Sequence, residues 1–246
     1  MSFSENRRAV EAEGDRELAE LEELEQRAEE CSRRLNPDVE PVVVEFAGSP
    51  KSGKSTTIDI LVHFFKRMGM KVAAPTEGAS KRTPYYLRRD LVAFNSWTLC
   101  YAISELLSNY YDNDRPSLII MDRGPFDSLA WMGLLHNRGE LSDDEFDHIK
   151  QFALHPRWTN LMSRLYLFTC SPHTSLERET ASKLTLRGGT AMNPELLQKL
   201  LDEYQQMSDL LSQYPVRAVD TSLGTTPRST AKELAEDILD LWEARM

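Results

Sequence analysis

The chain has 246 residues, of which 41% are hydrophobic and 28% are charged, and its formal net charge is −10. This length suits one large α/β domain or two small ones with a substantial core. The negative charge argues against non-specific nucleic-acid binding, which depends on cations that neutralise phosphates. No apolar stretch approaches the roughly 20 residues that span a bilayer, and the N-terminus lacks the apolar region of a secretory signal. We therefore expect a cytoplasmic protein without a membrane segment.

Residues 1–36 are expected to form a charged helical extension that is separate from the rest of the chain. A helix is predicted over residues 4–35, and Asn36-Pro37-Asp38 ends it because proline disfavours helix at the residue before it. Apolar residues recur three and four positions apart, as in a short coiled-coil seam. The seam consists of Leu21, Leu24, Ala28, Cys31 and Leu35. Two interpretations stay open: a helix that lies on its own domain, and a helix that binds a partner or a second copy of the chain.

Strand and helix patterns alternate along residues 40–246, which we predict to be one domain. The predicted strands are residues 42–47, 71–75, 117–122, 164–170 and 216–220. The predicted helices are residues 57–65, 87–109, 127–136, 142–154, 193–212 and 231–245. Continuous apolar strands that alternate with helices are typical of a parallel sheet covered on both faces.

The octet that follows the first predicted strand reads G-x-x-x-x-G-K-S, which is a phosphate-binding loop. Its glycines allow several backbone N–H groups to point at one anion, and the following helix places its N-terminus there. The predicted nucleotide-binding residues are Gly48, Ser49, Pro50, Lys51, Ser52, Gly53, Lys54, Ser55 and Thr56. Lys54 is expected to contact the β- and γ-phosphates, and Ser55 to bind Mg²⁺. The predicted fold is an α/β P-loop NTPase three-layer sandwich with a five-stranded parallel sheet.

Acidic residues follow the second and third predicted strands. In an open parallel sheet, ligands lie beyond the carboxyl ends of the strands, so Glu77 is expected to face the site. A carboxylate there can accept a proton from an acceptor hydroxyl or orient it. Asp122 ends the third strand, where a Mg²⁺ ligand is expected, and Arg123 follows it. The alternative for Glu77 is a solvated acid in a surface turn, and the alternative for Asp122 is an ion pair at the end of the strand that has no part in metal binding.

A basic segment precedes the long helix near the C-terminus. It contains Arg178, Lys183 and Arg187, followed by Gly188-Gly189. Cations that close over a transferring phosphoryl group stabilise its transition state, so we predict a lid around residues 178–192. Arg178 or Arg187 is the expected catalytic cation, and an exposed loop with solvated charges is the alternative.

The region between the second and third strands combines basic residues with aromatic ones. Lys81, Arg82, Arg88 and Arg89 suit an acceptor that already carries phosphate. Asn95 and either Trp97 or Tyr101 are expected to hold a planar base, although aromatics at helical spacing are more often core. The predicted substrate-binding residues are Glu77, Lys81, Arg82, Arg88, Asn95, Trp97, Arg123 and Asp127.

Together these motifs resemble the thymidylate kinase and deoxynucleoside kinase group of P-loop kinases over residues 40–246. The resemblance rests on the glycine-rich loop, Thr76-Glu77-Gly78, the Asp-Arg-Gly-x-x-Asp-Ser motif of residues 122–128, and the arginine-bearing lid. It implies that Glu77 lies near the acceptor hydroxyl and that Arg123 bridges donor and acceptor. The chain departs from the group at Gly124, where the related motifs have an aromatic or hydroxyl residue. The segment at Glu77 also lacks the arginine and proline of the thymidylate kinase motif.

The leading functional hypothesis is therefore a nucleotide or nucleoside kinase that uses ATP and Mg²⁺. The chain has no N-K-x-D guanine motif, which favours ATP as the donor. A small-molecule nucleotide or nucleoside is the expected partner, with a homo-oligomer or a protein bound through the N-terminal helix as an additional one. Two alternatives stay open: a kinase of another hydroxyl, including a modified nucleic-acid base, and a regulatory NTPase that signals through the N-terminal helix.

Overall fold

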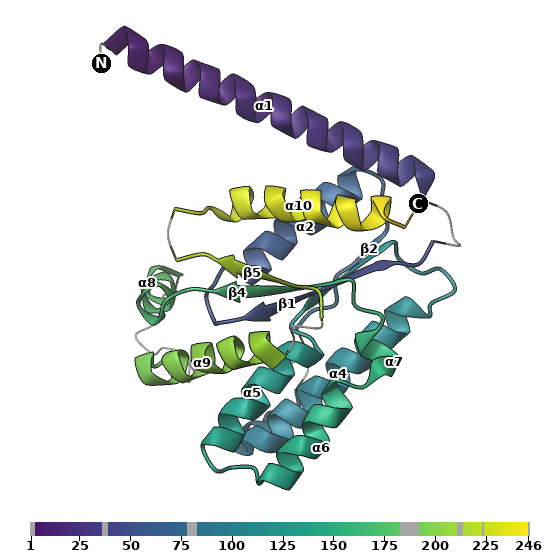
Figure 1. The fold of residues 1–246 in the computed structure, drawn as a ribbon, viewed down its shortest axis with the longest axis vertical. Coiled ribbons are helices and arrows are strands. Elements are labelled where there is room, and N and C mark those ends of the chain that lie inside the picture. Colours follow the sequence, from purple (N-terminus) through teal and green to yellow (C-terminus); the bar gives the residue numbers. More distant parts are fainter. Residues whose placement is uncertain are drawn as a thin grey trace.

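The computed structural model describes residues 3–35, 39–77, 83–182, 192–210, 214–222 and 224–245. Its centre is a five-stranded, all-parallel sheet in the order β2-β3-β1-β4-β5 (Figure 1). The strands are β1 (Val42–Gly48), β2 (Val72–Ala73), β3 (Leu118–Asp122), β4 (Arg164–Thr169) and β5 (Val216–Asp220). Since β1 lies between β3 and β4, the loop that follows it emerges at the middle of the sheet's carboxyl edge.

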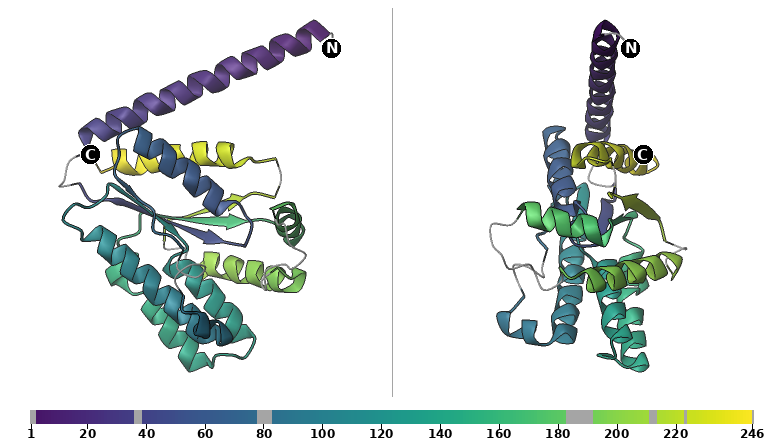
Figure 2. Two further views of the ribbon diagram at one scale, coloured as in Figure 1. Left: turned by 180° about the vertical axis from the view of Figure 1, so that it is seen from behind. Right: turned by 90° about the vertical axis from the view of Figure 1, so that its left-hand side faces the viewer.

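Helices cover both faces of the sheet, which gives three layers (Figures 1 and 2). One face carries α2 (Lys54–Arg67) and α10 (Pro227–Glu243), with α1 (Phe3–Arg34) outside them. The other face carries α4 (Leu91–Tyr110), α5 (Pro125–Asn137) and α9 (Pro194–Leu210), with α6 (Asp143–Ala153) and α7 (Pro156–Thr159) beside them. The short η1 (Tyr85–Arg89) precedes α4, and α8 (Pro172–Ser182) follows β4.

The two faces of β1 explain why its sequence is almost continuously apolar. Val42, Val44 and Phe46 pack in the core beneath α2 and α10, whereas Val43 and Ala47 pack in the core beneath α5 and α9. All are fully or almost fully buried, as expected for a central parallel strand. The α/β fold and the parallel sheet predicted from the sequence are confirmed.

The predicted seam of the N-terminal helix packs against its own chain. Leu24, Ala28 and Cys31 are buried in the core that contains α2 and α10. Arg27 adds ion pairs to Asp240 and to Glu243 on α10. The N-terminal part of α1 extends away from the rest of the molecule (Figure 2).

Several element boundaries differ from the prediction. The helix expected over residues 87–109 is divided, because Asp90 accepts a hydrogen bond from the Ala93 N–H (3.0 Å) and so caps α4. Two helices, α7 and α8, were not predicted. The start of the predicted lid, residues 178–182, belongs to α8, while residues 183–191 lie outside the described part of the chain. Within the described residues, no helix is long and apolar enough to cross a membrane.

Candidate active site

The loop between β1 and α2 lies over the carboxyl edge of the sheet and leads into the N-terminus of α2. Gly48 has a φ of +132°, and a Cβ at this position would lie 1.8 Å from the carbonyl oxygen of Phe168. Only glycine therefore allows β1 to approach β4 this closely at the start of the loop. Residues 50–57 line a cleft of about 580 Å³, and Ser49 is buried beneath them. The helix N-terminus facing this cleft favours an anion.

Lys54 is folded back over its own loop. Its Nζ donates to the carbonyl oxygens of Gly48 and Ser49, both at 2.8 Å, and is 3.3 Å from Ser52 Oγ. Burial and the positive charge of Arg123 lower the pKa of Lys54 to about 8. The lysine therefore lies at the floor of the cleft, without an anionic partner in direct contact among the described residues.

Two oxygen-bearing side chains meet beside Lys54, at the position predicted for Mg²⁺. Ser55 Oγ donates to Asp122 Oδ2 at 2.9 Å, and both residues line the cleft. A hydroxyl and a carboxylate are the hard oxygen donors that Mg²⁺ takes, and this ion commonly uses one or two protein ligands beside phosphate and water. The donor set at this point of the cleft therefore fits the ion.

Glu77 and Arg123 also line the cleft. Arg123 Nε lies 2.7 Å from Glu77 Oε1, and Arg123 Nη1 lies 2.7 Å from Asp127 Oδ2. Burial raises the pKa of Glu77 above its ordinary value, and the charge of Arg123 opposes that rise. The segments after β2 and β3 thus bring together three of the predicted site residues.

Asp127 lies under the phosphate-binding loop and does not line the cleft. Its Oδ1 accepts hydrogen bonds from the Gly48 N–H (2.9 Å) and from the Tyr204 hydroxyl (2.7 Å), while Oδ2 binds Arg123. Tyr204, on α9, also donates to the carbonyl oxygen of Gly48 at 3.1 Å. Asp127 therefore connects the first residue of the loop to Arg123.

Arg178 on α8 holds the outer side of the loop. Its guanidinium donates to the carbonyl oxygen of Lys51 (3.1 Å) and to both the hydroxyl (3.0 Å) and the carbonyl (2.5 Å) oxygen of Thr221. Thr221 in turn donates to the carbonyl oxygen of Ser52 at 2.9 Å. Arg178 lines the cleft, as predicted, from an anchored position on a helix.

The remaining predicted residues are spread more widely. Of the residues that the structure describes, those that line the cleft do not include Arg88, Asn95 or Trp97. Arg88 is exposed on η1, and the Asn95 amide donates to the carbonyl oxygen of Leu91 inside α4. Trp97 stacks on Tyr101, with ring centroids 5.2 Å apart. Lys81, Arg82 and Arg187 lie outside the described residues.

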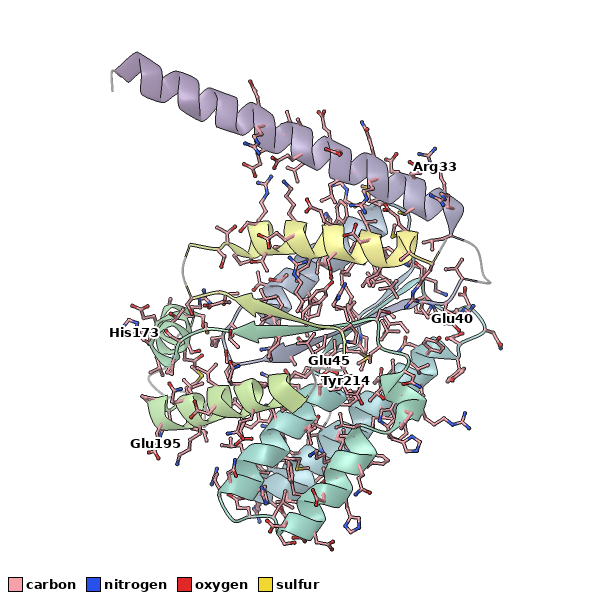
Figure 3. The ribbon with its side chains drawn as sticks, in the orientation of Figure 1. Arg33, Glu40, Glu45, His173, Glu195 and Tyr214 are labelled. Atoms are coloured by element: carbon pink, nitrogen blue, oxygen red, sulfur yellow. The ribbon has the colours of Figure 1, made fainter. Side chains whose placement is uncertain are left out.

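Three structural contributors were not identified from the sequence. Tyr204 and Thr221 bind the loop as described above, and Glu45 lies on the α5 side of the sheet (Figure 3). Of these three, only Glu45 could have been identified from the sequence, because a carboxylate inside an apolar strand needs hydrogen-bond partners. A row of hydroxyl side chains near the start of α10 also lines the cleft, namely Thr225, Thr226 and Thr230.

The fold has clear counterparts among solved structures. Deoxyadenosine kinase from M. mycoides with bound dATP is 17% identical and matches with a TM-score of 0.58, covering 81% of this chain and 99% of the kinase chain. The same enzyme with the products dCMP and a flexible dCDP is 15% identical, with a TM-score of 0.59 and the same coverage. The enzyme with dCTP is 16% identical, with a TM-score of 0.56. No family model matches the chain, and no curated protein does.

The sheet order, the loop and the flanking helices therefore define a P-loop fold of the deoxynucleoside kinase type. The similarity confirms the sequence resemblance at the level of fold.

Proposed function

We propose that this chain is an ATP:acceptor phosphotransferase, and specifically a nucleoside or nucleotide kinase. The observation that carries the proposal is the pairing of Glu77 with Arg123 at 2.7 Å in the cleft that Lys54 also lines. A protein that only binds or hydrolyses a nucleotide needs no carboxylate on the acceptor side of the phosphates. A phosphotransferase needs one that orients the acceptor hydroxyl or takes its proton. The deoxyadenosine kinase fold supports the same conclusion.

The donor side of the site is assigned to residues of the loop and β3. Bound Mg-ATP would supply the phosphoryl group. Lys54 would exchange its bonds to the loop carbonyl oxygens for the β- and γ-phosphates. Ser55 and Asp122, already 2.9 Å apart, would hold the Mg²⁺ ion.

The acceptor side is assigned to Glu77 and Arg123. A base works best when its pKa is near the working pH, and burial moves the pKa of Glu77 upward from its ordinary value. Glu77 would hold the acceptor hydroxyl and receive its proton. Arg123, placed between Glu77 and the loop, would stabilise charge on the transferring group.

Residues around the cleft and on neighbouring segments are assigned to the lid and to acceptor recognition. Arg178 and Arg187 would supply cations from the lid around residues 178–192. Lys81, Arg82, Arg88, Asn95, Trp97 and Asp127 would recognise or position the acceptor, Asp127 indirectly through Arg123. The acceptor would be a small nucleoside or nucleotide, and the enzyme would work in the cytoplasm, where ATP is available.

A screen of ATP consumption over nucleosides, nucleoside monophosphates and DNA tests the proposal. We expect one class of acceptor to stimulate turnover, and Glu77→Gln to lower the stimulated rate about 100-fold or more, since general-base catalysis contributes about 10²–10⁴-fold. Glu195→Gln is the control, because Glu195 lies on α9 with 76% of its side chain exposed. A regulatory NTPase would instead hydrolyse ATP at one rate with every acceptor, and Glu77→Gln would leave that rate unchanged.

A further inference from the structure

Glu45 is a carboxylate buried in the middle of β1, with 0% of the residue exposed, and it takes no part in the cleft itself. A buried carboxylate is costly unless hydrogen bonds satisfy it. Glu45 Oε1 accepts from the backbone N–H groups of Gly124 (3.0 Å) and Asp127 (2.8 Å), and Oε2 from that of Phe126 (3.3 Å). The N–H groups that bind Glu45 thus come from the N-cap and the first turn of α5.

These three N–H groups belong to the start of α5, where the first donors of a helix have no partner inside the helix. The residue at the N-cap of α5 is Gly124, which has no side chain to accept them. Glu45 supplies that acceptor from a neighbouring strand; burial raises its pKa to about 8, and the hydrogen bonds from these N–H groups oppose that rise. Glu45 therefore caps α5 from outside the helix.

The same contact determines the residue at position 124. A Cβ on Gly124 would lie 2.4 Å from Glu45 Oε2 and 2.5 Å from its Cδ. The φ of Gly124 is −123°, an ordinary extended value, so the constraint is one of space alone. The departure of this chain from the related kinase motifs at Gly124 thus has a physical cause, which is the buried carboxylate beside it.

The turn held in this way carries Arg123 in an unusual conformation. Arg123 has a φ of +65°, in the left-handed region, which is unfavourable for a residue with a Cβ. Such a conformation persists only where the surroundings enforce it. Its N–H donates to the Phe46 carbonyl oxygen at 3.1 Å, and its guanidinium spans Glu77 and Asp127. Glu45 fixes the backbone immediately after it.

We propose that Glu45 is a positioning residue for the phosphotransfer site: by capping α5 and excluding any side chain at position 124, it holds Arg123 between Glu77 and Asp127. This inference rests on the proposed function, because it assigns Arg123 to the acceptor side of that reaction. It makes Glu45 and Gly124 a coupled pair: Gly124 is required because Glu45 fills the space beside it, and Glu45 is required because Gly124 has no side chain that could cap α5.

A double-mutant cycle tests the coupling through the acceptor-stimulated rate. Gly124→Ala in the wild-type background should lower kcat at least 10-fold, because the new methyl group displaces the carboxylate, while KM for ATP changes little. Glu45→Ala should also lower kcat. Adding Gly124→Ala to Glu45→Ala should cost no more than about twofold further, since the clash is gone. Effects on kcat that multiply independently in the double variant would overturn the proposal.

Two further variants separate positioning from general loss of structure. Glu45→Gln keeps the shape and one of the two accepting oxygens, the one that can serve Gly124 and Asp127, so it should retain more of kcat than Glu45→Ala, and Gly124→Ala should remain harmful in its background. Gly14→Ala is the control for a glycine substitution, because no atom of the described chain lies within 4 Å of the added Cβ. It should change neither kcat nor thermal stability appreciably. Loss of kcat in Glu45→Gln equal to that in Glu45→Ala would contradict the proposal.

A crystal structure of Glu45→Ala gives a readout that does not depend on activity. We expect Arg123 to leave the left-handed conformation and to lose its bridge between Glu77 and Asp127. An unchanged Arg123 would refute the positioning role even if kcat fell. If the wild-type protein transfers phosphate to no acceptor, the proposed function fails, and this structure still decides whether Glu45 positions Arg123.

Discussion

At the scale of single residues, Lys54 has surroundings that a bound nucleotide must change. Its ammonium group is buried and bonded only to neutral oxygens of the loop, and its pKa is lowered to about 8. Phosphates placed beside it would favour the charged form and raise that pKa. At pH 8.5, above this pKa, most of the free protein would hold Lys54 neutral, so we expect nucleotide binding to take up a proton.

Isothermal titration calorimetry at pH 8.5, in two buffers of different ionisation enthalpy, measures this proton. We expect ATP binding to the wild-type protein to take up a substantial fraction of one proton at pH 8.5. At pH 7 the uptake should be much smaller, because Lys54 is then already mostly charged. Lys54→Met should remove the uptake and weaken binding. Binding at pH 8.5 with the same heat in both buffers would contradict the assigned pKa shift.

The loop that we propose binds the phosphates was recognisable from the sequence, whereas residues that hold the site in place were not. The loop from Gly48 to Ser55 has a spacing that its chemistry dictates, so the octet alone identified it. Glu45 is visibly out of place in an apolar strand, but its partner Gly124 lies 79 residues away. Tyr204 reads as an ordinary helical aromatic, and only tertiary packing brings its hydroxyl to Asp127.

At the scale of elements, the C-terminal half of α1 packs on the domain, whereas its N-terminal half projects away from it (Figure 2). Leu24 has 5% of its surface exposed and belongs to the core with α2 and α10, whereas Leu18 is 58% exposed. The predicted seam is therefore used within the chain, at least from Leu24 to Cys31. Any partner of this helix would have to bind elsewhere along it.

Two leucine substitutions on this one helix test that division. Leu24→Ala should lower the free energy of unfolding by about 2–4 kcal/mol, because it leaves a cavity in the core. Leu18→Ala should change it by less than about 0.5 kcal/mol, as exposed substitutions do. Urea unfolding measures both. Equal effects of the two substitutions would show that α1 does not pack on α10 in solution.

The elements with strong apolar patterns were predicted, and those without such patterns were missed. The strands and the helices that cover the sheet have buried faces, which give them their sequence periodicity. The missed helix α8 has only one buried residue, Ser175, so it carries no apolar stripe. Its role comes instead from Arg178, whose bonds to Lys51 and Thr221 join α8 to the loop and to the end of β5.

At the scale of the whole molecule, the parallel sheet brings the phosphate-binding loop, the proposed Mg²⁺ ligands and the Glu77–Arg123 pair together at one edge. β1 contributes the loop, β3 ends in Asp122 and Arg123, the segment after β2 carries Glu77, and Thr221 follows β5. This convergence follows from the parallel order alone, since the carboxyl ends of all strands meet there. The sequence therefore predicted the location of the site better than its acceptor, because acceptor recognition depends on the loops between strands.

Transfer of the terminal phosphate of [γ-³²P]ATP to an acceptor is the most direct test of the central claim. The acceptors are nucleosides, nucleoside monophosphates and DNA, and the labelled products are separated from free phosphate. We predict that the wild-type protein places the label on one class of acceptor. Glu77→Gln should still bind ATP but transfer at least about 100-fold more slowly. Release of all the label as free phosphate, at the same rate with and without every acceptor, would contradict the assignment of this fold and site to a kinase.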